Sequence, residues 1–160
     1  MTRVIAVGGS DAGISAALRA RELDPASEVT VVVADAYPNF SICGIPYYIS
    51  GEVAPWTSLA HRTAADLAAT GMDLRVDTPA THIDPAGKRL TVQGADGRSE
   101  ELAYDALVVG TGAVSVRPPI DGLADLGPEH GLHLLHSMGD TFALERSIED
   151  RQLRPRCSTA

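Results

Sequence analysis

Two short stretches near the start of the chain are predominantly apolar, residues 3–7 (RVIAV) and residues 28–35 (EVTVVVAD). Strands of this composition are typical of a parallel sheet that is covered on both faces. Between them, Ile14, Ala17 and Leu18 recur at the spacing of one helix face. The pattern therefore predicts a β-α-β unit at the start of the chain.

The middle of the chain predicts one more helix and one more strand. Leu59, Thr63 and Leu67 lie one helical turn apart, and this spacing predicts a helix over residues 57–71. Residues 72–77 (MDLRVD) alternate between polar and apolar positions. That alternation predicts a strand.

A hairpin and a buried strand follow. Residues 88–104 contain two alternating segments around Asp96-Gly97, a dipeptide typical of tight hairpin turns. Residues 106–110 (ALVVG) predict another buried strand, which runs into Thr-Gly-Ala. Prolines and glycines over residues 118–131 then predict a long loop.

The last predicted element is a helix over residues 137–150, in which Ser137 and Asp140 have the spacing of a capping box. The residues beyond it, 151–160, are basic, poor in apolar side chains and without periodicity. We therefore expect an α/β domain over residues 1–150 and an unstructured tail over residues 151–160.

Composition and charge narrow the classes of partner. Hydrophobic residues make up 44% of the chain and charged residues 21%, so a folded core is expected. The net charge of −8 disfavours nucleic acid and membrane surfaces as partners. No apolar run approaches the roughly 20 residues that cross a bilayer. We expect a cytoplasmic protein.

Sulfur chemistry in this chain depends on single thiols, because Cys43 and Cys157 are the only cysteines and no Cys-x-x-Cys pair is present. Gly44-Ile45-Pro46 follows Cys43, and proline suits the first position of a helix, so a helix beginning at about Pro46 is expected. The positive end of that helix would favour a reactive thiolate at Cys43. The alternative is a buried, inert cysteine.

The glycine turn after the first strand has the sequence Gly-Gly-Ser-Asp-Ala-Gly, residues 8–13. A strand, a glycine turn and a helix N-terminus together are typical of a diphosphate site. Ser10 stands where the dinucleotide motif usually has its middle glycine, and Asp35 is the nearest candidate for the acid that holds a ribose. Asp11 disfavours phosphate unless its side chain points away. A tight turn without a ligand is the alternative.

Other polar residues give weaker signals. His130, His133 and His136 recur every three residues, but the segment looks extended and would place neighbouring histidines on opposite faces, so no metal site is expected. His61 is expected to be a solvated or hydrogen-bonded residue rather than a catalytic base.

Three segments together carry a family resemblance: VGGSDAGISAALRARELDP, SICGIPYYISG and LVVGTGAVSVRPPIDG. They resemble the FAD-dependent pyridine nucleotide-disulfide oxidoreductases, in particular the single-cysteine branch of coenzyme A-disulfide reductases, NADH oxidases and NADH peroxidases. The double-cysteine branch would carry a second thiol at the position of Tyr48. The resemblance implies an FAD/NAD(P)-binding Rossmann-like three-layer domain with a parallel sheet and a small antiparallel β-meander, incomplete at the C-terminus.

The resemblance also implies a function and a set of site residues. FAD would be the cofactor and NAD(P)H the co-substrate. Cys43 would be the catalytic thiol that lies against the flavin and reduces a disulfide similar to coenzyme A disulfide, a peroxide or oxygen. The implied cofactor contacts are Gly8, Gly9, Ser10, Asp11, Ala12, Gly13, Asp35, Ala80, Thr111, Gly112 and Ala113, and the implied substrate contacts are Ser15, Arg19 and Asn39.

The chain also departs from that family. Oxidases and peroxidases of the branch often carry a histidine where Asp11 stands, and Ile42 replaces the polar residue that coenzyme A reductases tend to have before the cysteine. The resemblance implies a homodimer in the family, whose nicotinamide-binding domain and dimerisation domain have no counterpart in this sequence. We expect an N-terminal fragment of such an enzyme; the alternative is a catalytically inactive remnant or a nucleotide-binding module.

Overall fold

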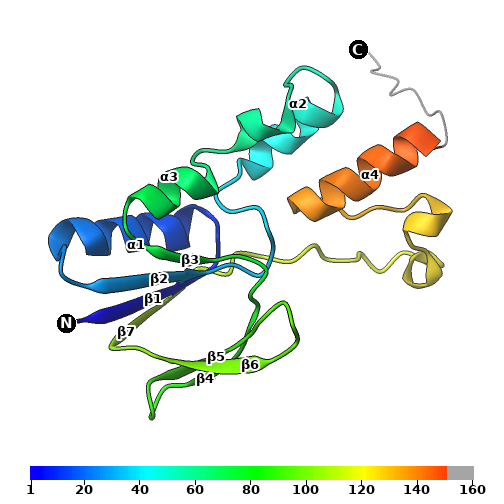
Figure 1. The fold of residues 1–160 in the computed structure, drawn as a ribbon. Helices are drawn as coiled ribbons and strands as arrows, with labels where there is room; N and C mark the ends of the chain where they lie inside the picture. The colour runs from blue at the N-terminus through cyan, green and yellow to red at the C-terminus, as the bar shows by residue number, and fades with distance from the viewer. Residues whose placement is uncertain (151–160) are drawn as a thin grey trace. The chain divides into compact units, whose positions relative to one another are not determined.

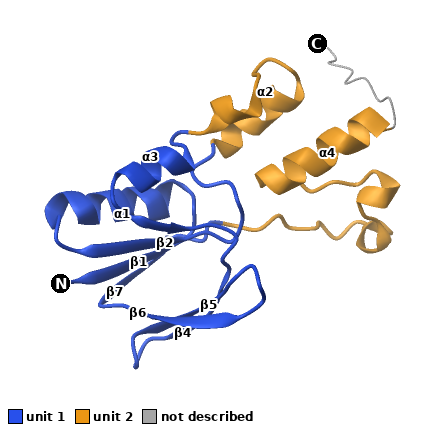
Figure 2. Ribbon diagram, viewed as in Figure 1, with its two compact units in different colours: residues 1–40, 61–112 blue, residues 41–60, 113–160 orange. Residues whose placement is uncertain are grey.

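The computed structural model describes residues 1–150 in two compact units, unit 1 (residues 1–40 and 61–112) and unit 2 (residues 41–60 and 113–150). Figure 2 shows the two units in different colours. The expected tail over residues 151–160, with Cys157, lies outside the described residues. Within residues 1–150, no helix is both long and apolar enough to pass through a lipid bilayer.

Unit 1 contains a four-stranded parallel sheet in the order β3-β2-β1-β7. The strands are β1 (Arg3–Val7), β2 (Glu28–Val32), β3 (Asp73–Arg75) and β7 (Ala106–Val109). β1 pairs with β2 from Arg3↔Glu28 to Val7↔Val32, and with β7 from Val4↔Ala106 to Val7↔Val109. The predicted strands and their parallel arrangement are confirmed, but the expected burial of residues 106–110 is wrong, because β7 is at the edge of the sheet and its residues are half-buried or exposed.

The helices of unit 1 are α1 (Asp11–Leu23) and α3 (Ala64–Ala69), and they lie on one face of the sheet (Figure 1). The residues buried between them and the sheet form one hydrophobic cluster. Its fully buried members include Ala6, Ile14, Ala17, Val31 and Leu67. Because successive side chains of a strand point to opposite faces, Ala6 of β1 points towards the helices.

The opposite face of the sheet is covered by an antiparallel meander of β4 (Ala80–Asp84), β5 (Arg89–Gln93) and β6 (Ser99–Ala103) (Figure 1). A second cluster fills this interface and contains Ile5, Val7, Val32, Leu90, Val92 and Tyr104. Helices, parallel sheet and meander make three layers, so the expected α/β Rossmann-like fold is confirmed. The hairpin at Asp96-Gly97 joins β5 to β6, with Gly97 at φ 78°.

Unit 2 contains short helical segments and one longer helix. They are the 3-10 helices Ile42–Gly44, Trp56–Leu59, Leu123–Asp125 and Pro128–His130, the short helix α2 (Ile45–Ile49), and α4 (Met138–Asp150). α4 begins with the predicted capping box, since the Ser137 amide donates to Asp140 Oδ2 at 2.9 Å and the Asp140 amide donates to Ser137 Oγ at 3.1 Å.

The predicted helix over residues 57–71 is wrong in its extent. It is interrupted between Leu59 and Ala64, and α3 is only six residues long. The reason is local, because the Thr63 hydroxyl accepts a hydrogen bond from the Asp66 amide and the Asp66 carboxylate accepts one from the Thr63 amide. This capping box begins a new helix at Ala64.

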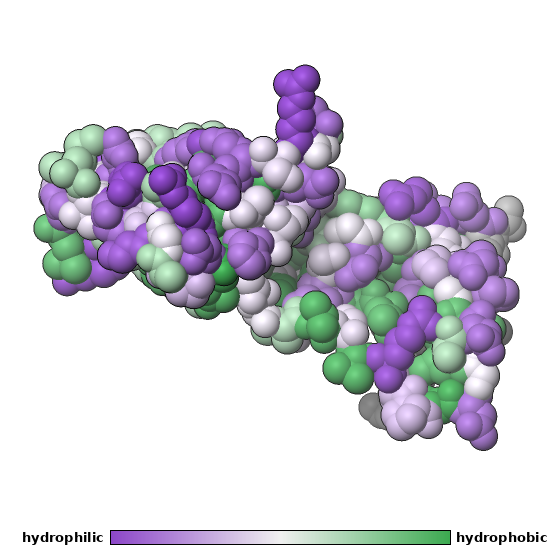
Figure 3. All heavy atoms as spheres, turned by 90° about the horizontal axis from the view of Figure 1, so that it is seen from below, coloured by the Kyte–Doolittle hydropathy of each residue, from purple (hydrophilic) through white to green (hydrophobic). Residues whose placement is uncertain are grey.

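Exposed apolar side chains occur in both units, and Figure 3 shows hydrophobic atoms among hydrophilic ones on one face. Val109 at the end of β7 is 59% exposed. In unit 2, Val114 is 84% exposed and Val116 is 80% exposed. Such scattered apolar residues are common on protein surfaces.

Candidate functional site

The glycine turn after β1 packs backbone directly against backbone. Gly8 has φ 115°, and a Cβ atom added to it would meet the carbonyl oxygen of Gly110, which follows β7. A Cβ atom on Gly13 would meet the carbonyl oxygen of Gly8, and one on Gly9 would lie 2.7 Å from Val33 Cγ1. The start of α1 and the end of β7 therefore meet without intervening side chains.

The first turn of α1 offers amide groups to a ligand. Ser10 occupies the N-cap position, but its side chain makes no capping hydrogen bond. The Ile14 amide donates to the Ser10 carbonyl at 3.1 Å, so the amides of residues 11–13 precede the helical ladder. Ala12 and Asp11 are exposed. A helix N-terminus with free amides and a positive dipole end fits a diphosphate.

The Asp11 carboxylate is held by residues from another segment of unit 1. Asn39 Nδ2 donates to Asp11 Oδ1 at 3.0 Å, and His61 Nδ1 lies 3.4 Å from the same oxygen. Sequence reasoning missed this cluster. The one available signal was the turn-forming Pro-Asn pair before the cysteine segment, which does not by itself specify a partner.

Three other predicted cofactor residues of unit 1 lie after the carboxyl ends of its parallel strands. Asp35 follows β2 and is exposed, and its Oδ1 accepts a hydrogen bond of 2.8 Å from the Tyr37 amide. Thr111 and Gly112 follow β7 and are exposed. A Cβ atom on Gly112 would meet nothing within 4 Å, so the space beside it is open. This edge of the sheet is where ligands bind in open α/β folds.

Two further predicted contacts lie elsewhere. Ala80 is the first residue of β4, pairs with Val92 and is half-buried. The segment before it runs beside the end of β2, because the Asp77 amide donates to the Asp35 carbonyl at 3.0 Å. Ala113 belongs to unit 2 and is exposed.

Cys43 lies in unit 2, in the 3-10 turn that leads directly into α2, and is an exposed free thiol. The expected helix start near Pro46 is confirmed, although α2 has only five residues. The turn is compact, since a Cβ atom on Gly44 would lie 2.6 Å from Leu59 Cδ2. Exposure at Cys43 does not fit the alternative of a buried, inert cysteine.

The predicted substrate residues differ in accessibility. Ser15 and Arg19 are exposed on α1, and Arg19 pairs with Glu22 at 2.8 Å. Asn39 is 1% exposed, and its Oδ1 is buried without a hydrogen-bond partner among the described residues. The hydrogen bonds that Asn39 does make have their partners in unit 1.

Unit 2 contains a pair that the sequence did not indicate. The Tyr48 hydroxyl donates to Glu145 Oε1 at 2.6 Å, and Trp56 and Phe142 meet edge to face with ring centroids 5.4 Å apart. Both contacts join residues around α2 to α4. Tyr48 therefore has a packing role. It stands at the position where the double-cysteine branch would carry its second thiol.

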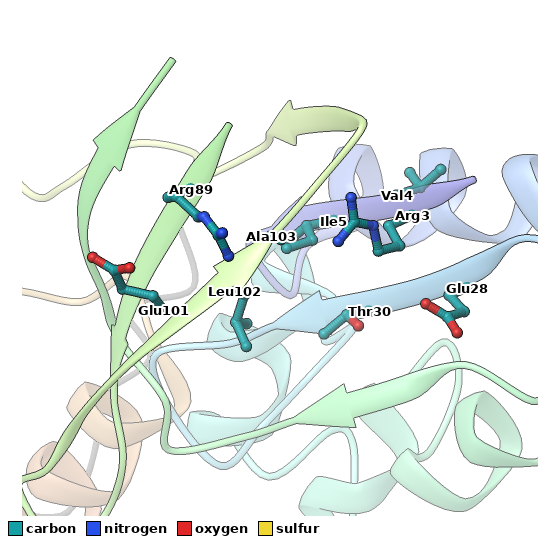
Figure 4. A pocket seen from close by; sticks show the side chains of 9 residues that line it. All are labelled: Arg3, Val4, Ile5, Glu28, Thr30, Arg89, Glu101, Leu102 and Ala103. Carbon is teal, nitrogen blue, oxygen red and sulfur yellow. The ribbon is translucent and has the colours of Figure 1, made fainter. Parts of the chain in front are cut away.

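A pocket of about 280 Å³ in unit 1 lies at the opposite ends of the strands from the glycine turn. Figure 4 shows its lining, which includes Arg3 of β1, Glu28 of β2 and Arg89 of β5. Arg3 is already paired with Asp105 at 3.2 Å. Because charges of both signs line it, the pocket has no clear preference for an anionic cofactor.

Among residues 1–150 no group of three or more histidine, cysteine or acidic side chains is placed to bind a metal ion. The histidines of the 130–136 segment lie in unit 2. His130 Nδ1 accepts a hydrogen bond of 3.2 Å from the Gly127 amide, which gives that side chain a structural role.

Comparison with known proteins places the chain among redox enzymes. The sequence profile of the family described as pyridine nucleotide-disulphide oxidoreductase matches residues 2–153. An NADH oxidase of Methanocaldococcus jannaschii is 28% identical over 149 residues, which cover 92% of this chain and 32% of that protein. An NAD(P)H coenzyme A polysulfide/persulfide reductase of Pyrococcus horikoshii is 30% identical over 134 residues, which cover 79% and 29%.

The fold of solved relatives matches as well. The crystal structure of reduced CoADR-RHD from Bacillus anthracis superimposes with a TM-score of 0.86 and 28% identity, covering 94% of this chain and 27% of that one. The chain thus spans about a third of the length of the curated relatives it matches.

Proposed function

Because the chain belongs to the pyridine nucleotide-disulphide oxidoreductase family, we propose that it forms the FAD-binding portion of an NAD(P)H-dependent oxidoreductase with Cys43 as its redox thiol. FAD is the cofactor of this family and NAD(P)H its co-substrate. The observation that carries the proposal is the side-chain-free junction of Gly8, Gly13 and Gly110 beside the uncapped start of α1. A diphosphate can approach backbone amides there.

The candidate cofactor residues of unit 1 have the following roles in this proposal. The amides of residues 8–13 hold the diphosphate, and Asp35 accepts hydrogen bonds from the adenosine ribose. Ala80 contacts the adenine through its backbone, and Thr111 and Gly112 make a second cofactor contact. The Asp11 carboxylate accepts a hydrogen bond from Asn39 Nδ2, which fixes its position but leaves its charge, so the diphosphate is held by the amides of the turn.

When bound, FAD supplies two-electron transfer from NAD(P)H. The Cys43 thiolate attacks a disulfide sulfur, so that a Cys43–substrate disulfide forms and one thiolate leaves. Two electrons from NAD(P)H then cleave this mixed disulfide, and the second thiol leaves after taking up a proton. Overall, one disulfide, one NAD(P)H and one proton give two thiols and NAD(P)⁺.

The proposed acceptor class is a small disulfide or persulfide, or oxygen or a peroxide. Sulfur acceptors are supported by the exposure of Cys43 and by the relative named as a persulfide reductase. Oxygen is supported by the relative named as an NADH oxidase. Either reaction passes through an accessible sulfur, as a mixed disulfide or a sulfenic acid.

The test is an FAD titration of the purified 160-residue chain followed by absorption spectroscopy. We expect bound flavin and a long-wavelength thiolate-to-flavin band that disappears in Cys43→Ser and persists in Cys157→Ser. A protein that takes up no added FAD would overturn the proposal. Retention of the band in Cys43→Ser would remove the role of Cys43.

A further inference from the structure

Asn39 connects the two points at which the chain leaves and re-enters unit 1. The chain passes into unit 2 over residues 41–60, the segment that carries Cys43, and returns at His61. The His61 amide donates a hydrogen bond of 2.9 Å to the Asn39 carbonyl. This hydrogen bond therefore joins the residues that flank the two ends of the segment over residues 41–60, which we call its base.

The same residue is bonded to the glycine turn twice. The Asn39 amide donates to the Gly9 carbonyl at 2.6 Å, and its Nδ2 donates to Asp11 Oδ1 at 3.0 Å. Asn39 is 1% exposed and has φ 59°, a left-handed conformation that asparagine tolerates better than most residues. Asn39 is thus buried and takes part in three hydrogen bonds, which a turn conformation alone does not require.

We propose that Asn39 fixes the base of the segment over residues 41–60, which carries Cys43, because it is hydrogen-bonded both to His61, where the chain returns to unit 1, and to the glycine turn. This inference rests on the proposed function, in which the glycine turn holds the diphosphate and Cys43 is the redox thiol. Asn39 acts through its backbone and side-chain hydrogen bonds within unit 1.

Asn39 differs from other residues with positive φ in its bonds to the glycine turn. Lys88 has φ 51° in the turn between β4 and β5, so it has a similar backbone cost without bonds to the glycine turn. Lys88→Ala is therefore the matched control. An effect seen in the Asn39 variants and absent in Lys88→Ala is not a general effect of substitution at a position with positive φ.

The side chain is tested by exchanging the two partners. Asn39→Asp keeps the size and the tolerance for positive φ but sets one carboxylate against that of Asp11. The double variant Asp11→Asn, Asn39→Asp restores an amide-to-carboxylate hydrogen bond with the groups reversed. Asn39→Gly keeps the backbone conformation without the side chain, in case Asn39→Asp fails to fold.

The first measurement is amide hydrogen exchange of the flavin-free 160-residue chain. We expect residues 41–60 to exchange about tenfold faster in Asn39→Asp and Asn39→Gly, and to return to within about twofold of wild type in the double variant. Lys88→Ala leaves their exchange unchanged. Unchanged exchange in both single variants would overturn the inference.

The second measurement uses FAD-loaded protein with Cys157 replaced by serine, so that Cys43 is the one thiol. We expect the thiolate-to-flavin absorption per bound flavin to fall at least about threefold in Asn39→Asp and to recover in the double variant. Faster exchange with unchanged absorption per flavin would also overturn the inference. If the wild-type chain takes up no FAD, the proposed function fails, and the exchange experiment alone decides the role of Asn39.

Discussion

The Tyr48 hydroxyl donates a hydrogen bond of 2.6 Å to Glu145 Oε1 and so joins α2 to α4 within unit 2. This hydrogen bond, together with burial, raises the pKa of Tyr48 to about 12. A raised pKa in the folded state favours the protonated phenol. The stabilisation is therefore complete below the unfolded pKa of about 10 and is lost as the pH rises from about 10 to about 12.

We expect Tyr48→Phe to lower the free energy of unfolding by about 1 kcal/mol at pH 7, because the carboxylate loses its donor. The variant also loses the stability change between about pH 10 and 12. Urea denaturation at several pH values and tyrosinate absorbance at 295 nm measure both effects. Tyr47→Phe is the control, since Tyr47 is 54% exposed, and it should match wild type. Equal losses of stability in Tyr48→Phe and Tyr47→Phe would contradict a stabilising role for the hydrogen bond to Glu145.

Gly8→Ala tests the backbone junction of the glycine turn. We expect it to destabilise unit 1 by about 3 kcal/mol or more, since the new Cβ meets the Gly110 carbonyl in addition to the cost of positive φ. Gly97 also has a positive φ, 78°, but has nothing within 4 Å, so about 1 kcal/mol is expected for Gly97→Ala. Denaturation of the two variants compares them directly. Similar values would show that contact with Gly110 is unimportant.

Asp35→Asn tests the proposed ribose contact. An amide accepts a hydroxyl hydrogen bond less strongly than a carboxylate, so FAD affinity should fall about tenfold while stability changes little. Glu28→Gln is the matched control at the other end of β2, and it should leave the affinity unchanged. Fluorescence titration with FAD gives both constants. Equal affinities for Asp35→Asn and wild type would exclude the contact.

Asp105→Asn tests the link between β1 and the start of β7. The Arg3 side chain and amide donate to the Asp105 carboxylate and hold its pKa below the usual 3.8. A lowered pKa contributes stability above pH 3.8 that is lost as the pH falls through the folded value. The variant should therefore be less stable than wild type at pH 7 and equal to it near pH 2.

Thermal unfolding across this pH range measures the difference. Glu22→Gln is the control, because Glu22 forms an exposed pair with Arg19 on a single helix. Such pairs contribute little, and its stability should follow wild type throughout. A pH-independent deficit in Asp105→Asn would point to lost packing instead of the ion pair.

Elements with strong local signals were predictable from the sequence. β1 and β2 are apolar because each lies between two covered faces, and a run of such residues is visible without knowledge of the fold. The hairpin turn at Asp96-Gly97 and the capping box at Ser137 depend on residues within four positions of one another. Nearby residues determine these elements, so the predictions were confirmed.

Elements that depend on distant contacts were not predictable. β4 has no buried residue and pairs with β5 across a shift of register, so it has no clear alternation. Asp11 and Asn39 are 28 positions apart, and Tyr48 and Glu145 are 97 apart. The periodicity of apolar residues shows which residues share a face of one helix or strand. It carries no information about pairs that are far apart in the sequence. The glycine turn was predicted, but the residues that hold Asp11 were not.

The backbone contacts of Gly8 and Gly13 change how a mutational scan of this family should be interpreted. Both positions exclude side chains because the empty fold already fills the space around them. Their intolerance to substitution would persist in a descendant that had lost every cofactor. Gly112 has open space around it and φ 68°, so the empty fold opposes a substitution there only through backbone strain.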